Sequence, residues 1–214
     1  MAVAGITHKI ENRVEPPISD YFHSSRRFYD AKEKINVIKI FSGDWYVSKS
    51  KDEMISTILG SCVSACIRDP EVGVGGMNHF LLPGDGTMDA LGNDSTRYGM
   101  FAMERLINEI IKSGGRKDRL EVKVFGGGNV LSNYSLIGTK NAKFIREFLH
   151  KEGLKIESED LEGNYPRKVN YYPCSGKVMM RFLRRKEDMV VVAEEALYEY
   201  KVVSKRIDTD IELF

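Results

Sequence analysis

Residues 59–83 read LGSCVSACIRDPEVGVGGMNHFLLP and are the most informative stretch of this chain. Two apolar, alternating segments flank the turn-forming run DPEVG at 69–73, which is the pattern of a β-hairpin. With the turn centred between the second and third residues of that run, Cys62 lies directly opposite His79. Opposed residues on antiparallel strands have Cβ atoms about 5 Å apart and point to the same face of the sheet. The pattern therefore predicts the thiol–imidazole pair of a cysteine hydrolase.

The composition is that of one soluble globular domain with an N-terminal extension. The chain has 214 residues, of which 42% are hydrophobic and 29% charged. A net charge of +1 argues against a dedicated nucleic-acid surface. No apolar run approaches the ~20 residues of a membrane span, so no membrane insertion is expected, and the N-terminus lacks the pattern of a signal peptide. Three cysteines do not suggest a disulfide framework, and the expected location is cytoplasmic, with reduced thiols.

The order of predicted elements indicates an α+β fold, because strands outnumber helices and are largely linked by hairpins. The clearest helices are expected over 97–113 and 138–152, each with an apolar stripe at helical spacing and a glycine stop. A short helix is expected near 21–34 and another helix over 190–204. Strands are expected at 35–41, 44–48, 54–59, 63–68, 74–82, 120–125, 155–159, 168–172 and 177–183. The predicted organisation is an extension at 1–34, one domain at 35–204 and a tail at 205–214.

Cys62 follows Gly60 and Ser61, which leave room for a substrate carbonyl and allow backbone N–H groups to point at it. Such groups form an oxyanion hole, whose loss typically costs about 3 kcal/mol of transition-state stabilisation. The alternative is that Cys62 is a small buried hydrophobe, as most single cysteines are. Taken by itself, the cysteine favours this second interpretation.

His79 is the one histidine of four that lies within a strongly apolar run, and as a general base it would take the proton of Cys62. Alternatively it is a core histidine whose ring is hydrogen-bonded to backbone. A third group usually orients a catalytic imidazole, and Thr57 and Ser56 on the preceding strand are the candidates. Asn78 alternates to the opposite face and is a poorer choice.

Two further motifs bear on ligand binding. Cys62, Cys66 and His79 could hold zinc, but a fourth ligand is missing and the cysteine spacing differs from that of common zinc knuckles, so no metal is expected. The run GGGN at 126–129 matches neither of the usual phosphate-binding patterns. It predicts a close backbone approach near the site, with Asn129 available for a polar contact to substrate.

Taken together, these motifs resemble the CheD family of chemoreceptor glutamine deamidases. The resemblance covers roughly residues 35–190. It is carried by the following blocks: LGSC at 59–62, GGMNHFLLP at 75–83, RYGM at 97–100, FGGGN at 125–129, IG at 137–138 with NA at 141–142, and EDL at 159–161 with Gly163. It implies a β-sandwich flanked by helices, shared with a wider group of cysteine deamidases. It also implies a catalytic triad of Cys62, His79 and a threonine, for which Thr57 fits by type and Ser56 fits if the spacing differs by one.

The resemblance further implies a reaction and its partners. The substrates would be glutamine side chains of methyl-accepting chemoreceptors, hydrolysed to glutamate through a cysteine thioester, with no cofactor. An alternative from a different class is an adaptor that binds chemoreceptors and a CheC-type phosphatase. A third hypothesis is a receptor methylesterase that uses the same thiolate.

Overall fold

Ten strands and two helices make up the computed structural model, which describes residues 26–82, 94–130 and 135–184. The strands are β1 (Arg27–Asp30), β2 (Ile35–Lys39), β3 (Trp45–Ser48), β4 (Glu53–Leu59), β5 (Val63–Asp69), β6 (Val74–Asn78), β7 (Glu121–Gly126), β8 (Ile156–Leu161), β9 (Arg167–Tyr172) and β10 (Lys177–Phe182). The helices are α2 (Asp94–Lys112) and α3 (Ser135–Lys151), with a short 3₁₀ turn η1 (Lys117–Arg119).

The strands form two five-stranded sheets that pack face to face. The first sheet has the order β1-β2-β4-β9-β10 and the second the order β3-β6-β5-β7-β8. Each sheet is mixed, because β2 pairs with β4 and β7 with β8 in parallel while the other neighbours are antiparallel. The predicted α+β class and sandwich are confirmed.

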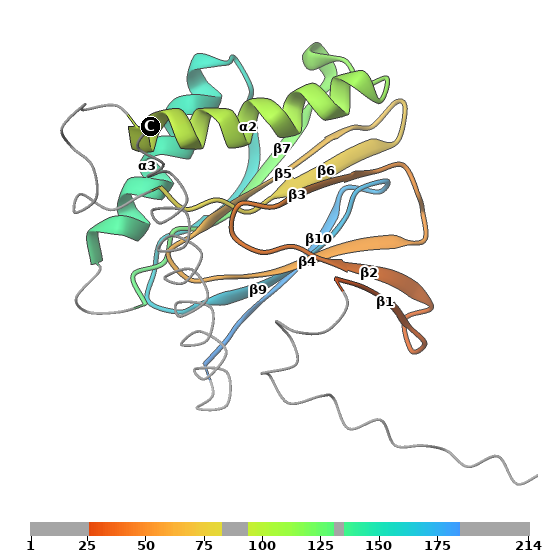
Figure 1. The fold of residues 1–214 in the computed structure, drawn as a ribbon, viewed down its shortest axis with the longest axis horizontal. Helices are drawn as coiled ribbons and strands as arrows, with labels where there is room; N and C mark the ends of the chain where they lie inside the picture. The colour runs from red at the N-terminus through yellow and green to blue at the C-terminus, as the bar shows by residue number, and fades with distance from the viewer. Residues whose placement is uncertain (1–25, 83–93, 131–134, 185–214) are drawn as a thin grey trace, which may run out of the picture.

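Both helices lie on the outer face of the second sheet, so the layers run helices, second sheet, first sheet (Figure 1). The stripe predicted for α2 is buried at Met103, Leu106, Ile107 and Ile110, as helical spacing requires. Its members at either end, Met100 and Ile111, stay exposed. No helix of the described residues is long and apolar enough to span a membrane.

Strand β5 divides its side chains between two cores because successive residues point to opposite faces. Val63, Ala65 and Ile67 pack in the cluster beneath the helices. Cys62, just before the strand, and Cys66 pack in the cluster between the sheets. The thiol of interest therefore faces the interior of the sandwich.

The hairpin of β5 and β6 forms, but its register differs from the predicted one. Asp69 pairs with Val74 and Cys66 with Met77, two positions further along β6 than expected. The cause is the turn, which spans residues 70–73 and closes with a hydrogen bond from the Gly73 N–H to the Asp69 carbonyl, Gly73 having a φ of +65°. The direct opposition of Cys62 and His79 is therefore wrong. A shift of two positions leaves both residues on the same face, since side chains alternate with a period of two.

The N-terminal part of the described chain departs from expectation. A helix is predicted near 21–34, but the described part, from residue 26, forms β1 and a turn that leads into β2. This edge strand is short and mostly exposed, so it lacks the alternation that would have indicated a strand. The helix expected over 190–204, the domain end at 204 and the tail at 205–214 lie outside the described residues.

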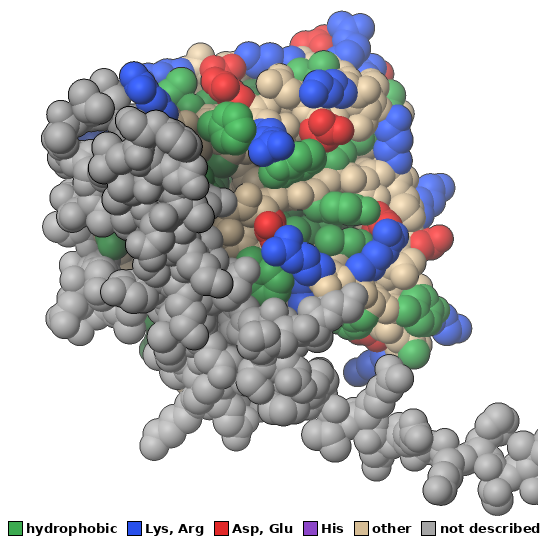
Figure 2. Space-filling model, viewed as in Figure 1, with side chains coloured by type: hydrophobic (Ala, Val, Ile, Leu, Met, Phe, Trp, Pro, Cys, Tyr) green, Lys and Arg blue, Asp and Glu red, His purple; other side chains and the backbone are tan. Residues whose placement is uncertain are grey.

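On the face shown in Figure 2, the charged side chains do not form a continuous patch of one sign. Lys and Arg side chains are interspersed there with acidic and apolar ones. This arrangement matches the nearly balanced formal charge of +1 for the whole chain.

Candidate active site

A hydrogen bond links the two sheets at the predicted site. Thr57 points inward from β4 of the first sheet, and its Oγ1 lies 2.8 Å from Nδ1 of His79, which directly follows β6 of the second sheet. The same hydroxyl donates a hydrogen bond of 2.8 Å to the Ile40 carbonyl. A hydroxyl has only one proton, so Thr57 accepts from the imidazole, and Nδ1 of His79 carries the proton. In the neutral ring the lone pair is then on Nε2, the form needed in a general base.

The ring of His79 is neutral in this environment. It is 1% exposed. Burial lowers the pKa of His79 to about 3 from 6.5, although a hydrogen bond with the Ile40 carbonyl works in the opposite direction. The backbone is also held, because the His79 N–H donates to the Asp44 carbonyl at 2.9 Å and its carbonyl accepts from Gly43 at 2.8 Å. The imidazole therefore rests uncharged in a fixed orientation.

Cys62 is equally buried, at 1% exposure, in the core between the sheets. The flanking pair of Val63 and Phe80 exchanges two backbone hydrogen bonds of 2.9 Å. Continuing this register makes Cys62 and His79 diagonal neighbours on one face, whose Cα atoms are typically about 7–8 Å apart. Thiol and imidazole thus lie on the same side of the second sheet, as predicted, although they are not directly opposed.

The turn that carries Cys62 is held by the glycine run at 126–128. The Gly127 N–H donates to the Cys62 carbonyl at 2.7 Å and the Gly128 N–H donates to the Gly60 carbonyl at 2.8 Å. A side chain at Gly126 would meet the Cys62 carbonyl oxygen at 2.1 Å, and its φ of +113° also favours glycine. The close backbone approach predicted for this run is confirmed.

Two predicted residues point elsewhere. Ser56 is adjacent to Thr57 on β4 and so faces the opposite side, where its Oγ donates to Oδ1 of Asn170 at 2.8 Å. The side chain of Asn129 is directed at the start of α3, where its Nδ2 lies 3.3 Å from Oγ1 of Thr139. Geometry therefore favours Thr57 over Ser56 as the group that orients the imidazole. A substrate contact for Asn129 stays a prediction.

Cys66 lies four residues beyond Cys62 and is also buried, at 2% exposure. Burial raises the pKa of the Cys66 thiol, and nearby Lys123 only partly opposes the effect. Within the described ranges, no group of three or more His, Cys, Asp or Glu side chains is arranged to hold a metal ion.

Two buried polar side chains near the turn carry no functional signal in the local sequence. Asn141 on α3 is fully buried and contacts the backbone of both Ser61 and Leu82. Arg167 on β9 is also fully buried and binds the carboxylate of Asp160 and the backbone carbonyls of Asp160 and Glu162. Asn141 occurred only as part of a family motif, and local sequence gives no sign of what either side chain contacts.

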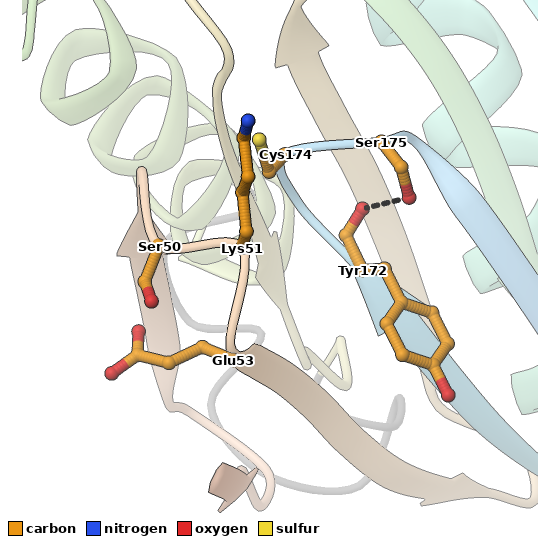
Figure 3. A pocket seen from close by; sticks show the side chains of 6 residues that line it. All are labelled: Ser50, Lys51, Glu53, Tyr172, Cys174 and Ser175. Atoms are coloured by element: carbon orange, nitrogen blue, oxygen red, sulfur yellow. Dashed lines mark hydrogen bonds between the residues drawn. The ribbon is translucent and has the colours of Figure 1, made fainter. Parts of the chain in front are cut away.

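A separate surface hollow of about 280 Å³ lies at the end of the first sheet, lined by Ser50, Lys51, Glu53, Tyr172, Cys174 and Ser175 (Figure 3). It contains none of the predicted site residues. The Glu53 carboxylate is already bound by the hydroxyls of Ser48 and Tyr46 and by Arg27. The hollow therefore offers no acidic group that awaits a ligand.

Fold and site together define an α+β sandwich protein with a thiol, an imidazole and a hydroxyl buried between its sheets. A family model described as CheD chemotactic sensory transduction matches residues 81–182. A probable chemoreceptor glutamine deamidase CheD from Hahella chejuensis is 45% identical over 93% of this chain and 95% of its own length. One from Rhodopseudomonas palustris is 46% identical over 97% and 99%. The chain belongs to the CheD family.

Solved structures add only a distant similarity. The Bacillus licheniformis hypothetical protein YfiH is 12% identical, with a TM-score of 0.38 over 69% of this chain and 67% of that one. A likeness at that level does not bear on function.

Proposed function

We propose that this chain hydrolyses glutamine side chains of methyl-accepting chemoreceptors to glutamate and ammonia, with Cys62 as nucleophile, His79 as general base and acid, and Thr57 orienting the imidazole. The names of the relatives support the substrate and the reaction, since they are probable chemoreceptor glutamine deamidases at 45–46% identity over nearly the whole chain. The observation that carries the mechanism is the 2.8 Å contact between Thr57 and Nδ1 of His79, which leaves the basic nitrogen of a buried ring for the thiol.

The first half of the reaction forms a thioester. Nε2 of His79 accepts the thiol proton of Cys62, and the sulfur attacks the carboxamide carbon, whose π electrons move onto oxygen. Backbone N–H groups of Ser61 and Cys62 stabilise that oxyanion. When the carbonyl re-forms, the C–N bond breaks, the imidazolium protonates the nitrogen and ammonia leaves.

The second half reverses the roles with water as nucleophile. His79 takes a proton from water, the hydroxyl oxygen attacks the thioester carbon, and the C–S bond breaks. The proton returns to sulfur, which restores the thiol of Cys62 and releases glutamate. No redox step is involved.

Burial of the site constrains how the substrate binds. Cys62 and His79 are each 1% exposed, so a glutamine side chain reaches the thiol only when the surrounding segments move. Receptor binding and site opening are therefore coupled in this proposal.

Mass spectrometry of the cytoplasmic part of a chemoreceptor, incubated with this protein, tests the proposal. Wild type should convert specific glutamines with a gain of about 1 Da each and release ammonia, the result of amide hydrolysis. Cys62→Ala should fold and convert none. Cys66→Ala is the matched control, since it removes a buried thiol from the same strand face.

Equal conversion by Cys62→Ala and wild type would refute the assignment of the nucleophile. A pull-down with the Cys62→Ala protein, chemoreceptor and a CheC-type phosphatase separates catalysis from binding. Stable complexes without deamidation by wild type would favour the adaptor instead. Methanol release from methylated receptor would indicate esterase activity.

A further inference from the structure

Asn141 connects the two segments that carry the thiol and the imidazole. Its Nδ2 donates to the Ser61 carbonyl at 2.9 Å, and its Oδ1 accepts from the Leu82 N–H at 2.9 Å. The side chain has no exposed surface. A buried amide with both ends satisfied by backbone is held in one orientation, and it holds its partners in return.

The contact with Ser61 fixes the peptide that joins Ser61 to Cys62. The described residues contain no cis peptide bonds, so the carbonyl and the N–H of this peptide point in opposite directions. Asn141 belongs to α3, which covers the outer face of the second sheet, whereas His79 and Thr57 lie between the sheets. Anchoring the Ser61 carbonyl to α3 therefore turns the Cys62 N–H toward the side of the imidazole.

The neighbouring peptides are fixed in the same way. The carbonyls of Gly60 and Cys62 accept hydrogen bonds from Gly128 and Gly127. Three donors thus hold the carbonyls of Gly60, Ser61 and Cys62. Asn141 is the only side chain among these three donors, and the other two are backbone N–H groups. The orientation of the middle peptide can therefore be changed by mutation without altering the backbone donors.

We propose that Asn141 is a positioning residue that orients the Cys62 N–H as the oxyanion donor of this site. The inference rests on the proposed function, because it assigns a role in that reaction. Donation by Nδ2 to the Ser61 carbonyl also polarises the same peptide, which makes its N–H a stronger donor. The contact with Leu82 secures the segment that follows His79, so one side chain sets both halves of the site.

The test compares Asn141→Ala with wild type in two reactions of the full chain. The first is ammonia release from the cytoplasmic part of a chemoreceptor, with kcat and KM measured separately. The second is alkylation of Cys62 by iodoacetamide, a displacement at carbon that forms no oxyanion. The expected result is a kcat about 10- to 100-fold lower, with KM and the alkylation rate each within about 3-fold.

Two further variants separate this role from a merely structural one. Asn141→Asp keeps an acceptor for Leu82 and, while ionised, has no proton to donate to Ser61, so its kcat should be as low as that of Asn141→Ala at a pH high enough to ionise it. Tyr171→Phe is the matched control, because it removes another buried hydrogen bond to a backbone carbonyl, the 3.2 Å contact with Ile67 of β5. It should lower the Tm while keeping kcat within about 2-fold.

A measurement on the unmutated protein covers the case in which the Asn141 variants do not fold. A receptor peptide with glutamate γ-semialdehyde in place of glutamine adds the Cys62 sulfur to its aldehyde carbon, and the thiol proton passes to oxygen. The amide proton of Cys62 should then shift downfield in the NMR spectrum, since it donates to that oxygen. An unchanged resonance on adduct formation overturns the proposal.

The remaining outcomes are also decisive. Active wild type with a folded Asn141→Ala of equal kcat overturns this inference alone. Parallel losses of kcat and alkylation overturn the oxyanion role, since the thiol itself would then be misplaced. Wild type that releases no ammonia overturns the proposed function and this inference with it.

Discussion

Thr57 and His79 belong to different sheets and share a hydrogen bond of 2.8 Å. The packing of the sandwich, rather than any local turn, therefore sets the orientation of the imidazole. Because the Thr57 hydroxyl also donates to the Ile40 carbonyl, one proton arrangement is selected for the ring. Catalysis should therefore depend on the hydroxyl of Thr57 rather than on its methyl group.

Thr57→Val should lower kcat for deamidation by about 10- to 100-fold, because the ring loses the acceptor that fixes its tautomer. Thr57→Ser keeps the hydroxyl and should restore most of the activity. Ser56→Ala, which loses only the contact with Asn170 on the other face, should stay within about 2-fold of wild type. Steady-state ammonia release measures all three. A greater loss in Ser56→Ala than in Thr57→Val would reverse the assignment.

The sequence predicts which side of each strand the site occupies better than it predicts which residues are opposed. Alternation in β5 and β6 places Cys62 and His79 on one face whatever the turn, because a two-residue shift preserves the face. The shift itself depends on how many residues the turn takes up, and DPEVG allows several turn types. Periodicity likewise identifies α2 and α3 with their buried faces.

Contacts between distant elements have no local signature. The choice of Thr57 over Ser56 requires knowing which face of β4 meets the second sheet, and only the packed sandwich decides that. Asn141 lies far along the chain from Ser61, and its polar side chain would be expected at the surface. Such a contact becomes evident only in the folded structure, where α3 packs against the turn that carries Cys62.

The low pKa of His79 predicts a pH-dependent stability. The pKa is about 3 in the folded protein and near 6.5 when exposed, so the unfolded state binds more protons between these values. The stabilisation that neutral His79 gives the folded state is complete above pH 6.5 and is lost as the pH falls toward 3. The free energy of unfolding should fall by about 3 kcal/mol between pH 7 and pH 4. Urea unfolding across this range should show a weaker pH dependence for His79→Gln than for wild type. The same substitution at exposed His150 is the control, and equal slopes for wild type and His79→Gln would contradict the prediction.

The glycine run predicts a stability effect that can be separated from ordinary backbone strain. Gly126→Ala brings a Cβ to 2.1 Å from the Cys62 carbonyl oxygen at a φ of +113°. Overpacking and strain together should cost about 3–5 kcal/mol of unfolding free energy. Gly153→Ala also has a positive φ, +69°, but nothing lies within 4 Å, so only about 1–2 kcal/mol should be lost. Chemical denaturation measures both losses. Similar values would mean that the turn at Cys62 adjusts to the added Cβ at a lower cost than its contacts indicate.

Cys66 should react slowly and be dispensable for deamidation, although it is buried in the same core as Cys62. Burial raises the pKa of Cys66, so its thiolate is scarce at neutral pH and iodoacetamide should modify it far more slowly than partly exposed Cys174. Cys66→Ala should keep deamidation within about 2-fold of wild type and lose about 1 kcal/mol of stability, because it removes packing and no reacting group. Peptide mass spectrometry after timed labelling gives the relative rates. Loss of activity in Cys66→Ala comparable to that in Cys62→Ala would instead mean that the two cysteines act as a unit, and would restore the shared metal site as the explanation.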